Sequence, residues 1–297
     1  MSTYLRLLRQ PWIALPHFLS TCRKCGGGFA MTGEGASLIR GRTKLRRQSG
    51  RGEVRCPYSM NKKIQREQMR ISYDAKITLS RAGDDGLLRF DAALDLLQDC
   101  EQFGADAIWE YTDWQAEHNI SMFLVYRQIR LTRLPEYGTD VQMVTYPYLC
   151  DRIFGKRYCL MTNDKNETLV ESWVSGAYVE LTTGAAVRVP IEITRSVELH
   201  EAPEPPFEGR KVVFPADADF KTLKSGLVRY RDTDKNGHMN NARYLEYALT
   251  GETFTAARVE YKQPAKRGDT YEVLQSGNFA KLAGTDGTEY ARIEFRA

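Results

Sequence analysis

The sequence predicts an α+β protein made of two similar halves, in each of which an antiparallel sheet curls around one central helix. Apolar residues alternate in many short segments, one long segment repeats them at helical spacing, and the same order of segments then recurs. The 297 residues are enough for two cores of ordinary size. We expect an extension over 1–59, an N-terminal domain over 60–195, a linker over 196–224 and a C-terminal domain over 225–297.

The first half begins with an alternating segment from Ile71 to Leu79, which is typical of a strand. Apolar residues then recur every three or four positions from Phe90 to Trp109, and this spacing predicts a long helix that is buried along one face. Four further strands follow in close order, and a polar turn at 163–166 joins the last two. These strands are expected at 122–131, 140–148, 153–162 and 168–181.

The second half repeats this order with a shorter helix. A strand at 225–230 precedes a helix at 239–249, and the expected strands that follow are 257–262, 270–275, 278–282 and 288–295. Each half also contains a strand, a proline, a polar turn, a glycine and another strand in the same sequence, at 130–140 and at 260–269. The recurrence indicates an internal duplication.

Charge is distributed unevenly along the chain. Residues 1–59 carry 11 Lys/Arg and 2 Asp/Glu, whereas the remaining residues carry 31 Lys/Arg and 36 Asp/Glu. The acidic body argues against nucleic acid as a partner, and no apolar stretch reaches the ~20 residues of a membrane span. We expect Met60 to be the natural start, with a transit peptide over 1–59 as the alternative. The expected location is the cytoplasm, or the plastid for a plant protein.

The six cysteines point to a reducing compartment and not to a metal centre. Cys22 and Cys25 form a CxxC pair, but no further ligands follow at the spacing that a zinc site needs. A redox CxxC would need a βαβ context, which the predicted elements do not provide. We therefore expect no bound metal and no cofactor.

The densest cluster of reactive side chains lies at 231–244, between a strand and a helix of the second half. His238 can act as a base near neutral pH, Asp234 can orient the histidine or a water molecule or attack directly, and Asn236 can donate its amide. Free N–H groups of the helix near Asn240 would favour developing negative charge. Such a run of Asp, Asn and Gly is also ordinary turn and capping sequence, so a structural role is the alternative.

The pattern Asp-x-Asn-x-His-x-Asn-Asn-x-x-Tyr, from Asp234 to Tyr244, resembles the active-site motif of the acyl-ACP thioesterases. The resemblance covers roughly residues 70–297 and implies a tandem (double) hot-dog fold. It implies hydrolysis of fatty acyl-ACP, which ends fatty acid synthesis, with acylated acyl carrier protein as the partner. Asp234, Asn236 and His238 of a catalytic C-terminal half would then assist the attack of water, while the N-terminal half would house the acyl chain.

The sequence departs from the family pattern in two ways. Pro264 stands where the family usually has a glutamate, so Gln263 and Asn240 become the auxiliary candidates. The second helix is short, which would change the surface through which copies pair and leaves a homodimer open. The acyl-pocket candidates, by resemblance and position, are Trp109, Trp114, Met122, Phe123 and Trp173, with ordinary hydrophobic core as the alternative for each.

Two other functions are compatible with the same residues. An acyl-CoA thioesterase of the hot-dog superfamily would use the same run at 234–238, and a non-catalytic acyl-binding or regulatory protein would explain the missing glutamate. Acyl carrier protein is acidic, so a basic surface patch of Arg152, Lys156 and Arg157 would favour the carrier protein as partner. The alternative is that these charges are only a solvated strand face.

Overall fold

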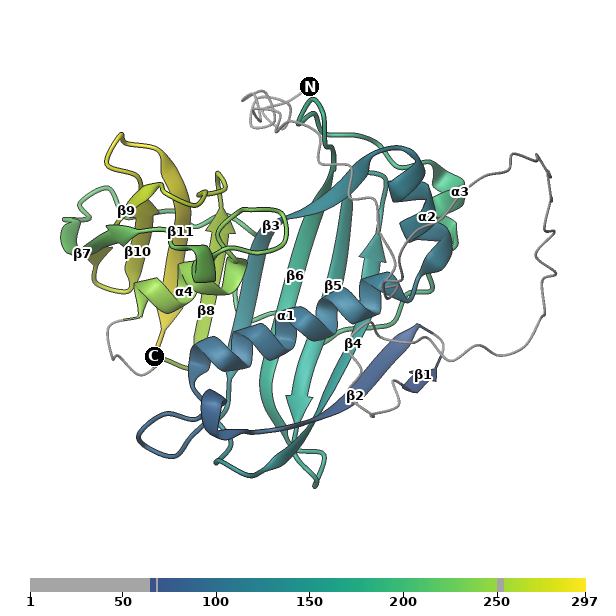
Figure 1. The fold of residues 1–297 in the computed structure, drawn as a ribbon, viewed down its shortest axis with the longest axis horizontal. Coiled ribbons are helices and arrows are strands. Elements are labelled where there is room, and N and C mark those ends of the chain that lie inside the picture. The colour runs from purple at the N-terminus through teal and green to yellow at the C-terminus, as the bar shows by residue number, and fades with distance from the viewer. Residues whose placement is uncertain (1–64, 68, 250–253) are drawn as a thin grey trace, which may run out of the picture.

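The computed structural model describes residues 65–67, 69–249 and 254–297, which form one antiparallel sheet of eleven strands and four α-helices (Figure 1). The expected α+β class is confirmed. The strand order is β1-β2-β4-β5-β6-β3-β8-β11-β10-β9-β7, so the two expected sheets are joined edge to edge as one. The extension at 1–59, with its CxxC pair, lies outside the described residues. Within the described residues, no helix is both long enough and apolar enough to cross a membrane.

In the first half, the long helix α1 (Phe90–Asp106) lies across one face of the curved sheet (Figure 1). The predicted helix to Trp109 is too long by one turn, because Ile108 leaves the helical backbone and Trp109 begins a second helix, α2 (Trp109–Glu117). The strands of this half are β1 (Gln65–Glu67), β2 (Arg70–Lys76), β3 (Ile120–Leu131), β4 (Asp140–Cys150), β5 (Phe154–Thr162) and β6 (Thr168–Glu180).

The second half has the same plan on a smaller scale. Its helix α4 (Asn241–Ala248) has 8 residues, against 17 in α1, as the sequence predicts. The strands are β7 (Lys221–Leu227), β8 (Ala256–Tyr261), β9 (Thr270–Ser276), β10 (Phe279–Ala283) and β11 (Glu289–Arg296). They lie within a few residues of the strands expected from the alternation of apolar residues.

The two halves meet where β3 pairs with β8. The antiparallel register runs from Tyr126 opposite Glu260 to Arg130 opposite Ala256. Apolar side chains of α1, such as Leu94 and Leu97, belong to the same buried cluster as side chains of α4 and of strands from both halves. The protein therefore has one continuous core across the duplication.

The linker lies on the outer face of the sheet, opposite α1. After the short helix α3 (Ile191–Arg195) it runs past Trp173, whose indole Nε1 donates to the carbonyl oxygen of Pro203 at 2.8 Å. Gln128 fixes the linker further along, because its side chain accepts from the N–H of Phe207 and donates to the carbonyl of Gly209. Trp173 thus packs under the linker, away from the sheet face that α1 covers.

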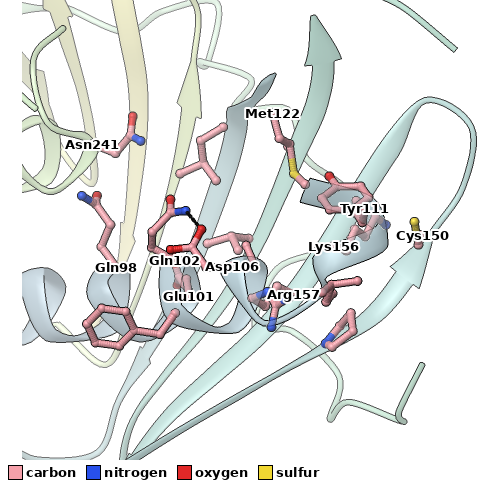
Figure 2. Close-up of a pocket in the computed structure, with 18 of the residues that line it drawn as sticks. Gln98, Glu101, Gln102, Asp106, Tyr111, Met122, Cys150, Lys156, Arg157 and Asn241 are labelled. Carbon is pink, nitrogen blue, oxygen red and sulfur yellow. Dashed lines mark hydrogen bonds between the residues drawn. The ribbon is translucent and has the colours of Figure 1, made fainter. Parts of the chain in front are cut away.

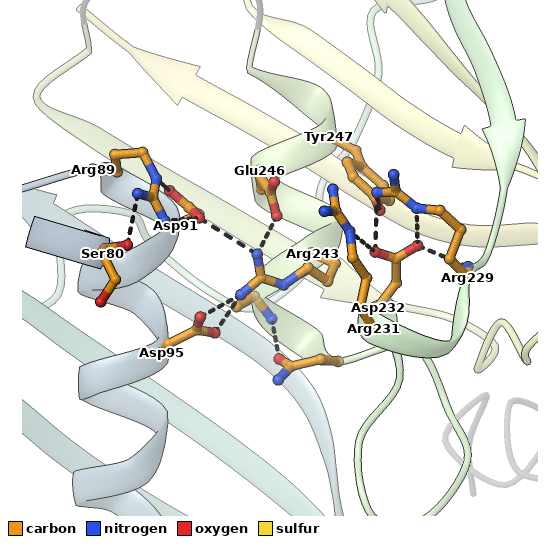
Figure 3. Close-up of polar contacts among 12 residues, drawn as sticks. Ser80, Arg89, Asp91, Asp95, Arg229, Arg231, Asp232, Arg243, Glu246 and Tyr247 are labelled. Carbon is orange, nitrogen blue, oxygen red and sulfur yellow. Dashed lines mark hydrogen bonds and ion pairs between the residues drawn. The ribbon is translucent and has the colours of Figure 1, made fainter. Parts of the chain in front are cut away.

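Arg243 of α4 forms the main polar link between the two helices (Figure 3). Its guanidinium binds Asp95 and lies 3.6 Å from Asp91, both on α1, and it also pairs with Glu246 one turn further along α4. The Arg243 side chain is only 14% exposed, and of its three carboxylate partners Asp91 also pairs with Arg89 at 3.1 Å.

We expect the change Arg243→Met to lower the free energy of unfolding by about 2–4 kcal/mol, because Asp95 and Glu246 lose the cation that lies between them in a half-buried site. Urea denaturation followed by circular dichroism measures this loss. As a control, Lys76→Met removes an ion pair with Asp140 in which both side chains are exposed, and it should cost less than about 1 kcal/mol. Equal losses in the two variants would contradict this account of the interface.

Candidate active site

Residues 233–239 form a tight loop at the start of α4. The N–H of Asp234 donates to the carbonyl of His238 at 2.8 Å, and the N–H of Gly237 donates back to the carbonyl of Asp234 at 3.1 Å. Gly237 has φ +76°, a left-handed conformation that favours glycine. The Asp234 side chain accepts from the N–H groups of Asn236 and His238, and both bonds go to Oδ1. Among the described residues, Oδ2 is therefore left for another donor, such as water.

Two neighbouring residues fix the ends of this loop. Asp232, which is 2% exposed, accepts from the backbone N–H and the guanidinium of Arg229 (Figure 3). Burial alone would raise the pKa of Asp232, but these hydrogen bonds outweigh it and lower the pKa. Asn240 is the N-cap of α4, and its side-chain oxygen accepts from the N–H of Ala242 at 2.9 Å. The capping role that the sequence left open for this run is therefore the role of Asn240.

His238 lies half-buried between the two halves of the protein. Its ring faces Phe123 of β3, with ring centroids 6.1 Å apart. Burial lowers the pKa of His238, Asp234 raises it, and the nearby cation of Lys266 lowers it again, so the net shift is downward. The imidazole is thus neutral at physiological pH, which is the form that can accept a proton.

The first half contains a loop with the same backbone but without the reactive side chains. The N–H of Gly83 donates to the carbonyl of Leu87, just as the N–H of Asp234 donates to the carbonyl of His238. Gly86, with φ +77°, corresponds to Gly237. The bridge between Leu87 and Glu136 likewise corresponds to the bridge between His238 and Lys266. The duplication therefore extends to the loop itself, where leucine and glycine replace the histidine and aspartate.

A cavity of about 580 Å³ connects the reactive loop to the interior of the first half. Asp234, Lys235 and Asn236 line its mouth, together with Asn241 of α4, and the cavity continues between α1 and strands β3 to β6. Figure 2 shows Asn241 at one end, with Tyr111 and Cys150 at the other. The cavity thus runs from the loop at 234–236 into the first half of the protein.

The predicted pocket residues have different positions. Met122 lines the cavity and packs on Gly176, where an added Cβ would lie 2.3 Å from its Cγ. Phe123 lies beside His238. Trp114 is part of α2, packs against the buried cluster that contains Tyr111 and Tyr178, and stacks on His118 with ring centroids 5.1 Å apart. Trp173 is on the opposite face of the sheet and is not among the lining residues, because alternate residues of a strand point to opposite faces. The side chain of Trp109 lies outside the described residues.

The segment after β8 holds the auxiliary candidate Gln263 away from the loop interior. Gln263 is exposed, and its backbone N–H donates to the carbonyl of Tyr290. The next residues turn back toward the active loop, since the N–H of Ala265 donates to Tyr244 Oη at 3.0 Å and Lys266 forms a bridge with His238. Lys266 is therefore the nearest titratable group that this segment brings to His238.

Several polar residues of the cavity are not evident from the motif alone. Glu101 of α1, Arg127 of β3 and Arg157 of β5 all line it. The expectation that Arg157 belongs to a surface patch is wrong, because its guanidinium points inward against Gly104 of α1. The only sign of the two arginines in the sequence is that a charged residue occupies an inward-facing position of β3 and of β5. Within the described residues, no group of three His, Cys, Asp or Glu side chains is arranged to hold a metal ion.

Comparisons with known proteins find similarity to acyl-ACP thioesterases. Residues 216–290 match the family model described as the acyl-ACP thioesterase C-terminal domain. The chloroplastic acyl-(acyl-carrier-protein) hydrolase FATB2 of Cuphea viscosissima is 24% identical over 161 residues, which are 50% of this chain and 39% of that protein. The match therefore spans less than half the length of this curated relative.

Solved structures extend the similarity to most of the described fold. The 12:0-ACP thioesterase from Umbellularia californica has a TM-score of 0.65 at 15% identity and covers 78% of this chain and 98% of its own. An acyl-ACP thioesterase from Bacteroides thetaiotaomicron has a TM-score of 0.63 at 16% identity, over 77% of this chain and 97% of its own. The tandem hot-dog fold implied by the sequence is thereby confirmed.

Asn240 allows the capping role to be separated from a catalytic one. Replacing it with alanine should lower the free energy of unfolding by about 1 kcal/mol, because the N–H of Ala242 loses its partner. Replacement with serine keeps a capping oxygen and should restore most of this stability. Urea denaturation of both variants provides the measurement. Equal stability of the alanine variant and the native protein would show that the cap contributes nothing.

The shifted pKa of His238 gives a second measurable consequence. The pKa should lie below the ordinary imidazole value of about 6.5, so the protonated form should build up only under acidic conditions. The change Lys266→Met removes a cation that lowers this pKa and should therefore raise it. Titration of the His238 ring by NMR measures both values. Lys262→Met, which removes a cation paired with Glu260, should leave the His238 pKa unchanged, and an equal shift would contradict the assignment.

Proposed function

We propose that the chain is an acyl-ACP thioesterase, which hydrolyses the thioester of fatty acyl-ACP to free fatty acid and ACP thiol; the matched C-terminal domain supports this proposal. One observation carries the proposal: Asp234 and Asn236 line the mouth of the same cavity that extends into the first half. A carrier arm that enters at the mouth would place its thioester at the loop and its acyl chain between α1 and the sheet.

The proposed reaction uses neutral His238 as the general base. It takes a proton from water as the water oxygen attacks the thioester carbonyl carbon, while Oδ2 of Asp234 orients that water. The amide of Asn236 and the N-terminal end of α4 at Asn241 stabilise the negative charge on the carbonyl oxygen. The C–S bond then breaks, and the proton on His238 passes to the departing thiolate. Each proton taken up is returned, so no cofactor is needed.

The first-half loop supplies a matched control for this mechanism. The changes His238→Ala and Asp234→Ala should each lower kcat by about 10²–10⁴-fold, the usual contribution of a positioned base or of its orienting group. Asp85→Ala removes a side-chain hydrogen bond from the corresponding turn in the first half, where Asp85 accepts from the N–H of Leu87 at 2.9 Å, and it should retain activity. Release of fatty acid from acyl-ACP is the assay, with thermal unfolding to check folding.

The outcomes of this assay separate the alternatives. Full activity in both the His238 and Asp234 variants would refute the proposed roles. Faster hydrolysis of acyl-CoA than of acyl-ACP with the same chain would assign the protein to the related acyl-CoA hydrolases. Tight binding of both thioesters by the native protein without turnover would favour a binding or regulatory role.

A further inference from the structure

Two arginines lie in one row across the inner face of the sheet. Arg127 of β3 is directly opposite Val174 of β6, and Val174 is directly opposite Arg157 of β5. Residues directly opposite in an antiparallel sheet share a face, and adjacent strands are about 4.8 Å apart, so the two arginine Cα atoms are roughly 10 Å apart. All three residues line the cavity, with Arg157 further from the second half and its reactive loop.

Helix α1 places a different residue against each of the two arginines. Glu101 faces Arg127, with Oε2 at 2.7 Å from Nη2, and Ser172 donates to its other oxygen. One helical turn further along, Gly104 faces Arg157, and an added Cβ there would lie 2.3 Å from Arg157 Nη1. Gly104 is not in the left-handed region, so its backbone does not require glycine, and the missing side chain instead makes room for the guanidinium.

Arg157 is left without a carboxylate partner in the described structure. Its Nη1 is buried without a hydrogen-bond partner among the described residues. The ion pair of Glu101 with Arg127 is close to neutral overall, whereas Arg157 adds a cation without a described ion-pair partner to a lining that also includes Lys156 and Asp106. Figure 2 shows Arg157 and Tyr111 in the part of the cavity away from Asn241.

A plain hydrocarbon chain does not match this lining. Filling the cavity with methylene groups would exclude water from the buried guanidinium of Arg157, which is unfavourable unless it finds a partner. An oxygen atom on the acyl chain would supply the missing acceptor. A carboxylate would also compensate the charge and can accept two hydrogen bonds from one guanidinium.

We propose that the cavity receives an acyl chain that carries an oxygen-bearing group, preferably a carboxylate, on its distal part, where Arg157 binds it. This inference names the substrate class of the proposed thioesterase site and rests on that function. Arg157 acts as a specificity residue, whereas Arg127 is held by Glu101 and serves the fold. An apolar residue at position 157 would suit an ordinary fatty acyl chain better, because it would leave no charge to be compensated.

Ligand binding tests the proposal without hydrolysis. The probes are the monomethyl ester of an α,ω-dicarboxylic acid and the methyl ester of the unsubstituted fatty acid, matched in chain length and compared by calorimetry at several lengths. The native protein should bind the carboxylate-bearing ester about tenfold more tightly or better, as a charge-assisted hydrogen bond provides. Arg157→Met should abolish this preference, while Lys165→Met, which removes a cation from the exposed turn between β5 and β6, should keep it.

Two further variants keep the test decisive if the methionine variant does not fold. Arg157→Lys should retain part of the preference, and Arg157→Gln should lose most of it while keeping a polar side chain. Equal or tighter binding of the unsubstituted ester by the native protein would overturn the proposal. An equal loss of affinity for both esters in the Arg157 variants would overturn it as well, because that result indicates a purely structural role.

Hydrolysis separates this inference from the proposed function. Acyl-ACP substrates that end in a methyl, a hydroxyl or a carboxylate group should show kcat/KM rising in that order for the native protein, and the order should reverse in Arg157→Met. If all three acyl-ACP substrates are hydrolysed and the methyl-ended one is preferred, the proposed substrate class is wrong, whereas the thioesterase function is supported. If the protein prefers the carboxylate-bearing ester but hydrolyses none of the acyl-ACP substrates, the thioesterase function is wrong, whereas the carboxylate site is supported.

Discussion

The pairing of β3 with β8 is the interaction on which the rest of the structure depends. It joins the two halves into one sheet and places Arg127 of the first half directly opposite Val259 of the second. Because of this register, the ring of His238 faces Phe123 of β3, and the loop at 234–238 opens onto a cavity formed mainly by the other half. The reactive groups and the space for a ligand come from different copies of the repeat, so neither copy alone would contain both.

The duplication separates the geometry of the loop from its chemistry. Both copies place a left-handed glycine, at 86 and at 237, in the same hydrogen-bonded turn before a helix. One copy has a leucine where the other has His238, and a glycine where the other has Asp234. The turn therefore forms without the histidine, which argues that His238 is present for a reason other than folding, whereas Asp234 also accepts two backbone hydrogen bonds of its own loop. The two halves also differ in helix length. The first half, whose loop lacks the histidine, has the long helix α1, which covers the cavity.

Periodicity predicted most of the fold, because a two-residue or a 3.6-residue repeat is a local property of the chain. It located every main strand of the second half and the start of α1 at Phe90. It could not assign faces, since alternation shows that two faces differ and not which one the helix covers. Trp173 was placed on the wrong face for that reason. Arg157 was wrongly expected on the surface, because its position follows from strand pairing and from Gly104, a residue distant in sequence.

The interior of the first half carries two features that a purely structural core would avoid. A buried polar atom without a partner costs about 1–3 kcal/mol, and a charged one costs more, so Arg157 lowers the stability of the ligand-free protein. Glycine is also a poorer helix former than alanine by up to about 1 kcal/mol, although Gly104 lies in the last turn of α1, where the cost is smaller. Glu101 shows that α1 can present a carboxylate to this row of arginines. At the next position facing the row, Gly104 instead makes room for the guanidinium of Arg157, and a buried cation without a described carboxylate partner is arranged to bind an anion rather than to stabilise the fold.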